Sequence, residues 1–557
     1  ENIRDHGGVS FIDLRDMYGV LQVVIRKPEL LKGITKEMCL SITGLMEHRD
    51  EETYNPKIPS GTIELEAHKI DVLGRVYKQL PFEIQTSKEI REDVRLKYRY
   101  LDLRNAKVKD NIVFRSKVIS YLRQKMTDMG FLEIQTPILC ASSPEGARDY
   151  IVPSRKFKGK FYALPQAPQQ YKQLLMASGF DKYFQIAPCF RDEDARADRS
   201  PGEFYQLDME MAFASQEDVF SIVEQVLPPV FEKYGIYKEA SKAPFVRIPY
   251  LEAMDKYGSD KPDLRIDLVL TDATEVMQGC GFAPFEGQTV KAIVVDDFTA
   301  TRKQIDEICA EVEVQTARKG FWFRVDENGE FVGGISKFLQ DRKEEVIKAL
   351  GLKNGDFVGL AAGKKLEAQK TAGVYRKLLG AASEKHMKKD CYEFCWIVDF
   401  PMYEIGEESG ELEFCHNPFS MPQGGMDALN NQDPLEILAY QYDLVCNGVE
   451  LSSGAVRNHD PEIMIKAFEL VGLGEADVKA KFPAMYNAFC YGAPPHAGIA
   501  PGVDRMIMLI CGEESIREII PFPMNKNAMD IMMGAPGTVE QKQLDELHLA
   551  ITAKPED

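Results

Sequence analysis

Residues 190–210, FRDEDARADRSPGEFYQLDME, constrain the fold more than any other segment of the chain. An apolar strand leads into Arg191, a charged loop follows, and a second strand returns through Phe204 and Asp208. The Pro201–Gly202 pair, with alternating apolar and polar residues on either side, predicts an antiparallel hairpin. The hairpin would present an arginine, an aromatic ring and several carboxylates on one surface. This set suits a nucleotide, because arginine binds phosphate and a ring stacks on a base.

Two further segments accompany the hairpin. They are FLEIQTPIL at 131–139 and PPHAGIAPGVDRMIML at 494–509, the second carrying Gly498, Gly502 and Arg505. With SPEGARDY at 143–150 and LPQAPQQYKQLL at 164–175, they resemble the three motifs of the class II aminoacyl-tRNA synthetases in the variants of the bacterial-type aspartyl-tRNA synthetases. The resemblance covers nearly the whole chain. Arg191 alone could equally belong to a structural ion pair, but the full set argues against this interpretation.

Length and charge limit the remaining possibilities. A chain of 557 residues is too long for one core, so two to four domains are expected. The net charge of −19 argues against extensive non-specific contacts with nucleic acid. Residues 88–125 are the exception, with 12 Lys and Arg against 5 Asp and Glu. This stretch is either a solvated helix face or a contact to an RNA backbone.

Compartment follows from weaker signals. The 11 cysteines are scattered and form no CxxC pair, which favours a reducing cytoplasm over a disulfide or zinc framework. No apolar run approaches the roughly 20 residues that cross a bilayer, so no membrane partner is expected. The chain begins at Glu1 in what reads as the middle of a strand, so we expect missing N-terminal residues, and import into an organelle stays open.

The expected fold is a multidomain α+β protein. Residues 1–85 read as an OB-type β-barrel without its first strand, and the resemblance implies a class II antiparallel-sheet catalytic domain interrupted by an α+β insertion. The resemblance implies that a helix at 112–129 and a strand at 131–139 form a homodimer interface, whereas the residues alone indicate only a buried helix. The expected parts are 1–85 (OB-type, anticodon-binding), 86–110 (hinge or linker), 111–267 (catalytic, first part), 268–390 (bacterial-type insertion), 391–535 (catalytic, second part) and 536–557 (C-terminal extension).

The resemblance implies aspartate–tRNA ligation through an aspartyl-adenylate. Arg191 would hold the α-phosphate of ATP and Arg505 the γ-phosphate, while Phe204 and Arg505 would enclose the adenine. Asp443 and Glu450 lie seven residues apart, two turns if helical, and match the family's Mg²⁺ positions. The catalytic residues are Arg191, Glu450 and Arg505, and the ATP contacts are Arg191, Asp192, Glu193, Phe204, Glu450, Gly502, Val503, Asp504 and Arg505.

Aspartate specificity is expected from cations. Arg457 would form a fork with the side-chain carboxylate and Lys172 would add a second cation. Asp208 and Gln169 would bind the α-ammonium group or its surroundings, and Glu145 would contact the same group. His416 would lie on a loop that closes over aspartate, although a lone histidine is more often structural.

The N-terminal unit is expected to bind the anticodon of tRNA-Asp. Phe11 lies on the polar face of its strand and offers a stacking surface. The histidine at position 6 resembles the residue of relaxed enzymes that charge tRNA-Asn as well as tRNA-Asp. The sequence leaves open whether this chain charges tRNA-Asn. The anticodon residues are Arg4, His6, Phe11, Gln22, Arg49 and Glu64.

Four positions depart from the family pattern, namely Ala167, Ser200, Asn417 and Pro501, and Gly202 reads as a one-residue insertion. None removes a charged catalytic group. The alternatives are an asparagine or lysine synthetase, a non-catalytic RNA-binding paralogue and an amide-forming ligase. An asparagine enzyme would not call for two cations at the substrate side chain, and a lysine enzyme would call for carboxylates there.

Overall fold

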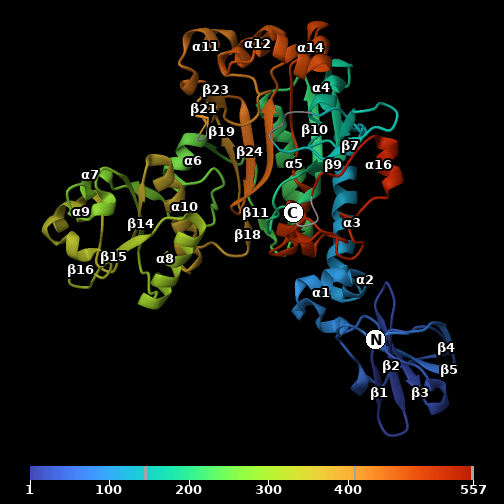
Figure 1. Cartoon of the computed structure of the whole chain (residues 1–557). Coiled ribbons are helices and arrows are strands. Elements are labelled where there is room, and N and C mark those ends of the chain that lie inside the picture. The colour runs from blue at the N-terminus through green and yellow to red at the C-terminus, as the bar shows by residue number, and fades with distance from the viewer. Residues whose placement is uncertain (143–146, 407–408, 554–557) are drawn as a thin grey trace. The chain divides into compact units, whose positions relative to one another are not determined.

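The computed structural model describes residues 1–142, 147–406 and 409–553. The chain forms two compact units, Glu1–Ser87 and Lys88–Asp557. Figure 1 shows the elements of both units. The expected α+β class is confirmed, with an all-β first unit and a mixed second unit.

The first unit is a five-stranded sheet in the order β1-β2-β3-β5-β4. Its pairs are antiparallel except β3 with β5. The alternation in β2 places Ile12 in the core with Val23 and Leu65, while Phe11 stays partly exposed on the other face. A short strand, β1, precedes the first strand expected from the sequence. The strands are β1 (Ile3–Asp5), β2 (Ser10–Arg15), β3 (Val20–Ile25), β4 (Cys39–His48) and β5 (Ile63–Gly74).

The second unit is built on an eight-stranded sheet in the order β12-β19-β24-β25-β26-β10-β9-β6. It is antiparallel except at its two ends, where β12 pairs with β19 and β6 with β9 in parallel. The strands are β6 (Leu132–Glu133), β9 (Lys182–Arg191), β10 (Gly202–Ala212), β12 (Val246–Pro249), β19 (Phe394–Val398), β24 (Gln441–Cys446), β25 (Val449–Val456) and β26 (His496–Ile499).

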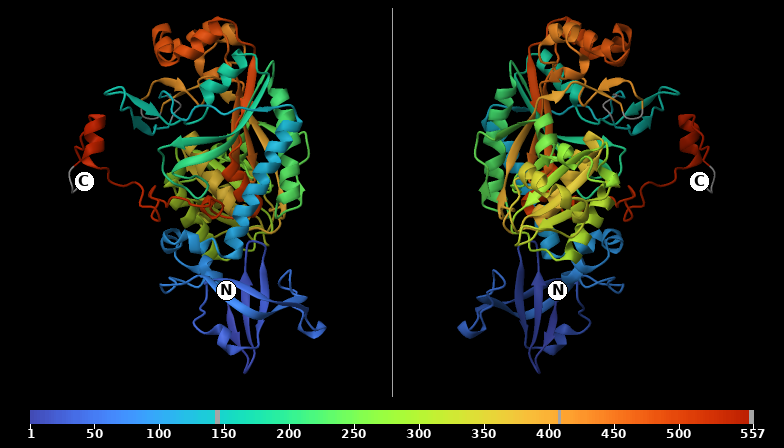
Figure 2. Two further views of the ribbon diagram at one scale, coloured as in Figure 1. Left: turned by 90° about the vertical axis from the view of Figure 1, so that its right-hand side faces the viewer. Right: turned by 90° about the vertical axis from the view of Figure 1, so that its left-hand side faces the viewer.

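Helices α3 (Ala106–Asp128), α5 (Gln216–Tyr234) and α15 (Val503–Cys511) cover one face of this sheet. Figures 1 and 2 show α3 and α5 side by side. Their apolar stripes, for example Leu122 and Val223, pack with Leu207 and Met209 of β10 into one core. The opposite sheet face carries a smaller apolar cluster that includes Ile397 and Val445, as well as polar side chains of β10 such as Asp208.

The first long helix and the strand after it differ in length from the sequence predictions. The helix expected at 112–129 begins at Ala106, because the Asn105 side chain accepts a hydrogen bond from the Lys107 N–H and caps it. The strand expected at 131–139 has only the two ladder residues of β6, and one further bond joins Ile134 N–H to Phe184 O at 3.0 Å. Pro137 lies in the part that leaves the sheet and has no N–H to donate to a ladder.

Two arginines of the basic segment 88–125 have structural partners. Arg95 and Arg99 are buried against Asp102, and Arg95 also pairs with Glu518 at 2.8 Å. These two arginines therefore join the segment to the C-terminal part of the unit instead of meeting an RNA backbone. Short helices α1 (Glu92–Lys97) and α2 (Arg99–Asp102) carry them.

The insertion folds around its own five-stranded sheet, in the order β13-β14-β17-β15-β16. Alternation along β14 sends Val290 and Ala292 to one core and Ile293 and Val295 to another. The two ends of the insertion run side by side, because Lys388 N–H donates to Arg265 O at 2.8 Å. Its elements are β13 (Leu270–Asp272), α7 (Thr274–Met277), β14 (Thr289–Val295), α8 (Arg302–Thr316), β15 (Phe321–Val325), β16 (Phe331–Val332), α9 (Lys343–Leu350), β17 (Phe357–Gly363) and α10 (Lys365–Ala381).

The remaining elements surround the eight-stranded sheet. They are β7 (Ile151–Pro153), β8 (Phe161–Ala163), α4 (Gln169–Ala177), β11 (Glu239–Ala240), α6 (Tyr250–Tyr257), β18 (Cys391–Tyr392), β20 (Phe400–Pro401), β21 (Tyr403–Ile405), β22 (Leu412–Phe414), α11 (Gly425–Asn431), β23 (Leu438–Ala439), α12 (Pro461–Leu470), α13 (Glu475–Lys481), α14 (Pro483–Cys490) and α16 (Gln541–Leu547).

Candidate active site

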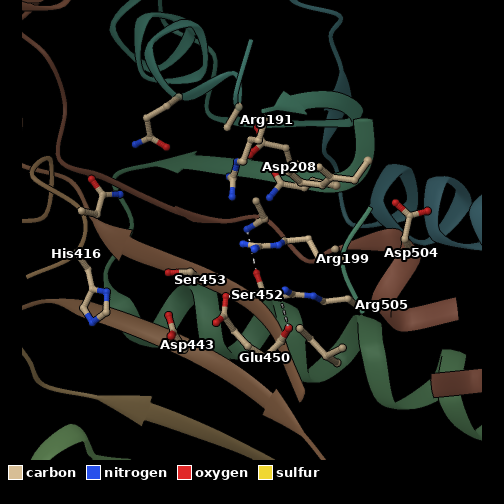
Figure 3. A pocket seen from close by; sticks show the side chains of 18 of the residues that line it. Arg191, Arg199, Asp208, His416, Asp443, Glu450, Ser452, Ser453, Asp504 and Arg505 are labelled. Carbon is tan, nitrogen blue, oxygen red and sulfur yellow. Dashed lines mark hydrogen bonds and ion pairs between the residues drawn. The ribbon is translucent and has the colours of Figure 1, made fainter. Parts of the chain in front are cut away.

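A cavity of about 660 Å³ lies on the sheet face opposite the helices. The alternation of β10 divides its side chains, so that Leu207 and Met209 enter the core while Phe204, Gln206 and Asp208 line the cavity. Figure 3 shows charged side chains from β9, β10, β24, β25 and α15 converging here. Such a concave site with a few convergent polar groups is the usual form of a small-molecule site.

The expected hairpin is present as β9 and β10, with Arg191 opposite Gly202. The Arg191 guanidinium lies 5.0 Å from the Phe204 ring centroid, and its buried Nε has no hydrogen-bond partner within the described parts of the chain. Glu193 lies one turn beyond β9, in the loop, where it accepts a hydrogen bond from Arg199 at 2.9 Å. Arg191 therefore keeps donor capacity for a ligand in the cavity.

Four buried charges form the floor of the cavity. Lys172 Nζ lies 2.6 Å from Asp208 Oδ1 and 3.4 Å from Glu210 Oε2. Arg457 donates from Nε to Glu210 Oε1 at 2.8 Å and from Nη2 to Oε2 at 3.1 Å. All four side chains are at most 2% exposed, and their formal charges sum to zero. We refer to Lys172, Asp208, Glu210 and Arg457 as the charge quartet.

The quartet gives Arg457 a protein partner that the sequence did not predict, and its contact to a substrate carboxylate stays a prediction. One edge of its guanidinium is already forked on Glu210, so only the remaining edge, with Nη1, is left for a ligand. Glu210 was not among the expected site residues. Its signal was its place two residues after Asp208 on the same strand, which puts both carboxylates on one face.

The two quartet carboxylates differ in proton affinity. Burial raises the pKa of Asp208, and Lys172 opposes this shift. Burial would also raise the pKa of Glu210, but Arg457 and Lys172 together hold it below its ordinary value. Asp208 Oδ2 and Gln169 Nε2 are buried without a partner in the described chain. An unpartnered acceptor and donor beside a cavity are what a polar ligand would satisfy.

The motif at 502–505 supplies a further cation, Arg505. Arg505 donates from Nη1 to Glu450 O at 2.8 Å and from Nε to Asp198 O at 3.2 Å, which directs the guanidinium along the cavity wall (Figure 3). Gly502 precedes α15 and also lines the cavity. Asp504 lines the cavity too, but both of its oxygens are engaged, one with Arg115 and the other with the Tyr205 N–H.

Val503 is fully buried in the core, and Asp192 bonds through its N–H to Arg148 O. Neither is among the residues that line the cavity. His416 lines it from the loop between β22 and α11 and packs edge-on against Phe400, with ring centroids 5.0 Å apart. Glu145 lies outside the described residues.

Asp443 and Glu450 lie on neighbouring strands, not on a helix. The turn at Asn447–Gly448 joins β24 to β25, and Val445 pairs with Glu450. Burial and the charge of Glu450 raise the pKa of Asp443, whose Oδ1 is buried without a partner in the described chain. This donor pair fits a hard cation, which takes oxygen ligands. Groups of three or more His, Cys, Asp or Glu fit to hold a metal are absent from the described residues.

Comparison with known proteins identifies the family. The family tRNA synthetases class II (D, K and N) matches residues 91–526, and an OB-fold nucleic acid binding domain matches residues 1–73. The aspartate–tRNA ligase of Streptomyces coelicolor is 53% identical over 556 residues, covering 99% of this chain and 94% of the relative. The chain belongs to the aspartate–tRNA ligase family of class II tRNA synthetases.

Other relatives have names that include a second tRNA. The aspartate–tRNA(Asp/Asn) ligase of Zymomonas mobilis is 53% identical over 563 residues, covering 99% of this chain and 94% of its own. Among solved structures, the asparaginyl-tRNA synthetase of Pyrococcus horikoshii with asparaginyl-adenylate matches at a TM-score of 0.56 and 17% identity, covering 94% and 92% of the two chains. At that identity the match shows the fold alone.

In this ligase, the residues that the sequence predicts for anticodon binding form two groups on the first unit. Gln22 Nε2 donates to Glu64 Oε2 at 2.8 Å, and Arg4 contacts Gln22 at 3.3 Å. Arg49 lies 3.8 Å from Glu64. The His6 ring meets Phe11 edge-on, with centroids 5.7 Å apart.

The departures from the family pattern also have places in the ligase. Ala167, Ser200 and Asn417 line the cavity. Asn417 Oδ1 accepts a hydrogen bond from Phe419 N–H at 2.9 Å, and Pro501 O accepts one from Leu207 N–H at 2.8 Å. In the described chain, no helix is long and apolar enough to cross a membrane.

Several lining residues were not among the expected site residues. Asp198 and Arg199 come from the loop between β9 and β10, and Ser452 and Ser453 from β25. Asp260 and Lys261 come from the segment that leads into the insertion. Neither of these last two belongs to a recognisable motif, so only the fold brings them to the cavity.

Proposed function

We propose that this chain ligates L-aspartate to tRNA-Asp through an aspartyl-adenylate formed from ATP. The observation that carries the proposal is the charge quartet on the floor of the cavity. The quartet is neutral, and so is the sum of the α-ammonium and the side-chain carboxylate of aspartate. Asp208 offers its unpartnered Oδ2 to the ammonium, while Lys172 and the free edge of Arg457 face the carboxylate.

The same quartet disfavours the competing amino acids. Asparagine would place a neutral amide beside Lys172 and Arg457, so these buried cations would lack the negative charge of a carboxylate. Lysine would add a third cation to the same place. Buried charged donors that lose their partner are costly, so discrimination by such a site is strong. Gln169, beside Asp208, completes the polar surface around the ammonium.

Adenylate formation brings the α-carboxylate of aspartate toward the α-phosphate of ATP, and pyrophosphate leaves. The two anions need positioning and positive charge more than a protein nucleophile. Arg191 supplies charge at the α-phosphate, Arg505 at the γ-phosphate, and Phe204 a face for adenine. Asp443 and Glu450 would hold Mg²⁺, which supplies further positive charge to the phosphates when bound.

In the second step, the terminal adenosine of tRNA attacks the adenylate carbonyl and AMP leaves. The first unit supplies anticodon contacts through Phe11 and the polar group around Gln22 and Glu64. His6, beside Phe11, and the Asp/Asn name of the Zymomonas mobilis relative favour charging of tRNA-Asn as well.

We also propose that the enzyme is a homodimer that works in the cytoplasm. Leu132, Ile138 and Leu139 are 54%, 46% and 53% exposed, which favours an apolar interface along 112–139. No disulfide joins two cysteines in the described chain, which suits a reducing compartment.

The test is ATP–pyrophosphate exchange with aspartate, asparagine and glutamate in the absence of tRNA. Exchange with aspartate should exceed that with either analogue by at least about a hundredfold, the discrimination expected when buried polar groups lose their partner. No exchange with aspartate, or faster exchange with asparagine, would contradict the proposal. Charging assays with purified tRNA-Asp and tRNA-Asn then decide between strict and relaxed tRNA specificity.

A further inference from the structure

Lys261 lies in the loop that leads from α6 toward the insertion. The loop is fixed at its start, because Gly258 has φ +66° and a Cβ there would lie 2.2 Å from Gln369 O of α10. Lys261 lines both the catalytic cavity and a second cavity of about 980 Å³ that is also lined by α10. Its side chain is 40% exposed, so the ammonium has room to move between the two spaces.

The Lys261 ammonium faces two carboxylates. Its Nζ lies 3.1 Å from Glu450 Oε2 and 3.4 Å from Asp260 Oδ2. The guanidinium of Arg505 is bonded to the backbone of Glu450 but is farther from its carboxylate, with 3.8 Å between Nη1 and Oε1. Asp443, 4% exposed and with an unpartnered Oδ1, is a third carboxylate whose charge acts on Lys261. Lys261 is therefore the counter-ion nearest to Glu450 within the described chain.

We propose that Lys261 is a positioning residue that holds Glu450 while no divalent cation is bound and withdraws toward Asp260 when Mg²⁺ binds Asp443 and Glu450. The proposal rests on the assignment of those two carboxylates as metal ligands. Lys261 and a divalent cation carry the same sign and share a ligand, so each weakens the binding of the other. Asp260 gives the displaced ammonium a partner, which keeps it from being released unpaired.

The test compares the wild-type full chain with Lys261→Met and Lys261→Arg, using Mn²⁺ alone as the probe and no ATP. Free Mn²⁺ measured by electron paramagnetic resonance gives the affinity. Lys261→Met should bind Mn²⁺ about fivefold more tightly, the ratio that corresponds to about 1 kcal/mol for a partly exposed ion pair. Lys261→Arg keeps the competing charge and should stay within about twofold of wild type.

Lys370→Met is the matched control, because Lys370 lines only the second cavity. Its Mn²⁺ affinity should equal that of the wild type. An unchanged affinity in Lys261→Met, or no binding in any variant, would overturn the proposal. Lys261→Met combined with Asp443→Asn separates the two assumptions: retained tight binding means that the metal lies elsewhere, which refutes both the ligand assignment and the role of Lys261. A thermal melt of each variant confirms that the chain is folded.

Discussion

Arg457 pairs with Glu210 and, under the proposed function, also contacts the side chain of aspartate, so its removal should have two separate effects. Arg457→Met removes the fork on Glu210 and leaves that carboxylate buried with only Lys172 at 3.4 Å. Breaking a buried ion pair by removing one partner costs about 3–5 kcal/mol of stability. The same change removes a charged hydrogen bond to the aspartate side chain, worth about 1.5–3 kcal/mol. Efficiency with aspartate should then fall roughly 10- to 150-fold.

The double variant Arg457→Met, Glu210→Gln separates the two losses. Removing both members of a buried pair is often close to neutral for stability. The double variant should therefore melt close to the wild-type temperature while its exchange with aspartate stays low. Thermal melts and ATP–pyrophosphate exchange, with KM for ATP as the internal control, measure both. If exchange recovers together with stability, Arg457 acts only through Glu210 and the proposed substrate contact is wrong.

Three further predictions concern other parts of the molecule. Phe11→Ala should raise KM for tRNA roughly 5- to 150-fold, from about 1–3 kcal/mol of base stacking, and leave pyrophosphate exchange unchanged; loss of both would mean that the ring is structural. Light scattering at micromolar concentration should give about twice the 62.9 kDa chain mass, and a monomer would refute the dimer. Burial raises the pKa of Glu518, but the hydrogen bond and charge of Arg95 outweigh burial and lower it below its ordinary value of 4.5. The ionised carboxylate therefore stabilises the fold above pH 4.5 and loses this effect as the pH falls. Glu518→Gln should have a lower melting temperature than wild type at pH 7, and the difference between the two melting temperatures should narrow below pH 4.5.

Local patterns in the sequence predicted the hairpin well. The Pro201–Gly202 signal and the alternation through Asp208 are properties of neighbouring residues, and β9 and β10 pair as expected. An Asn-Gly turn signal at Asn447–Gly448 was equally local. It indicates a hairpin, and it contradicts the helical spacing considered for Asp443 and Glu450.

Long-range pairing was beyond the sequence. Arg457 and Glu210 are 247 positions apart, and only the order of β25, β26 and β10 in the sheet brings them into contact. A pattern on one strand states which face a carboxylate takes, but not which cation it meets there. Lys261 shows the same limit, because its loop reaches the cavity through packing against α10.

Because the two ends of the insertion lie side by side, an insertion domain could be gained or lost there with little change to the rest of the chain. Ile266 bridges Met387, and Asp267 N–H donates to His386 O at 3.3 Å, so the chain leaves and re-enters the catalytic domain at almost one point. The entropy of closing a loop grows only slowly with its length. A whole folded domain at this point therefore adds little entropic cost to folding of the catalytic sheet beyond that of a short linker. The main obstacle to excision is Arg376 of α10, whose guanidinium donates to the carbonyl oxygens of Asp263, Ile266 and Leu268. A linker that replaced residues 268–390 would leave the carbonyl oxygens of Asp263 and Ile266 without the Arg376 donor.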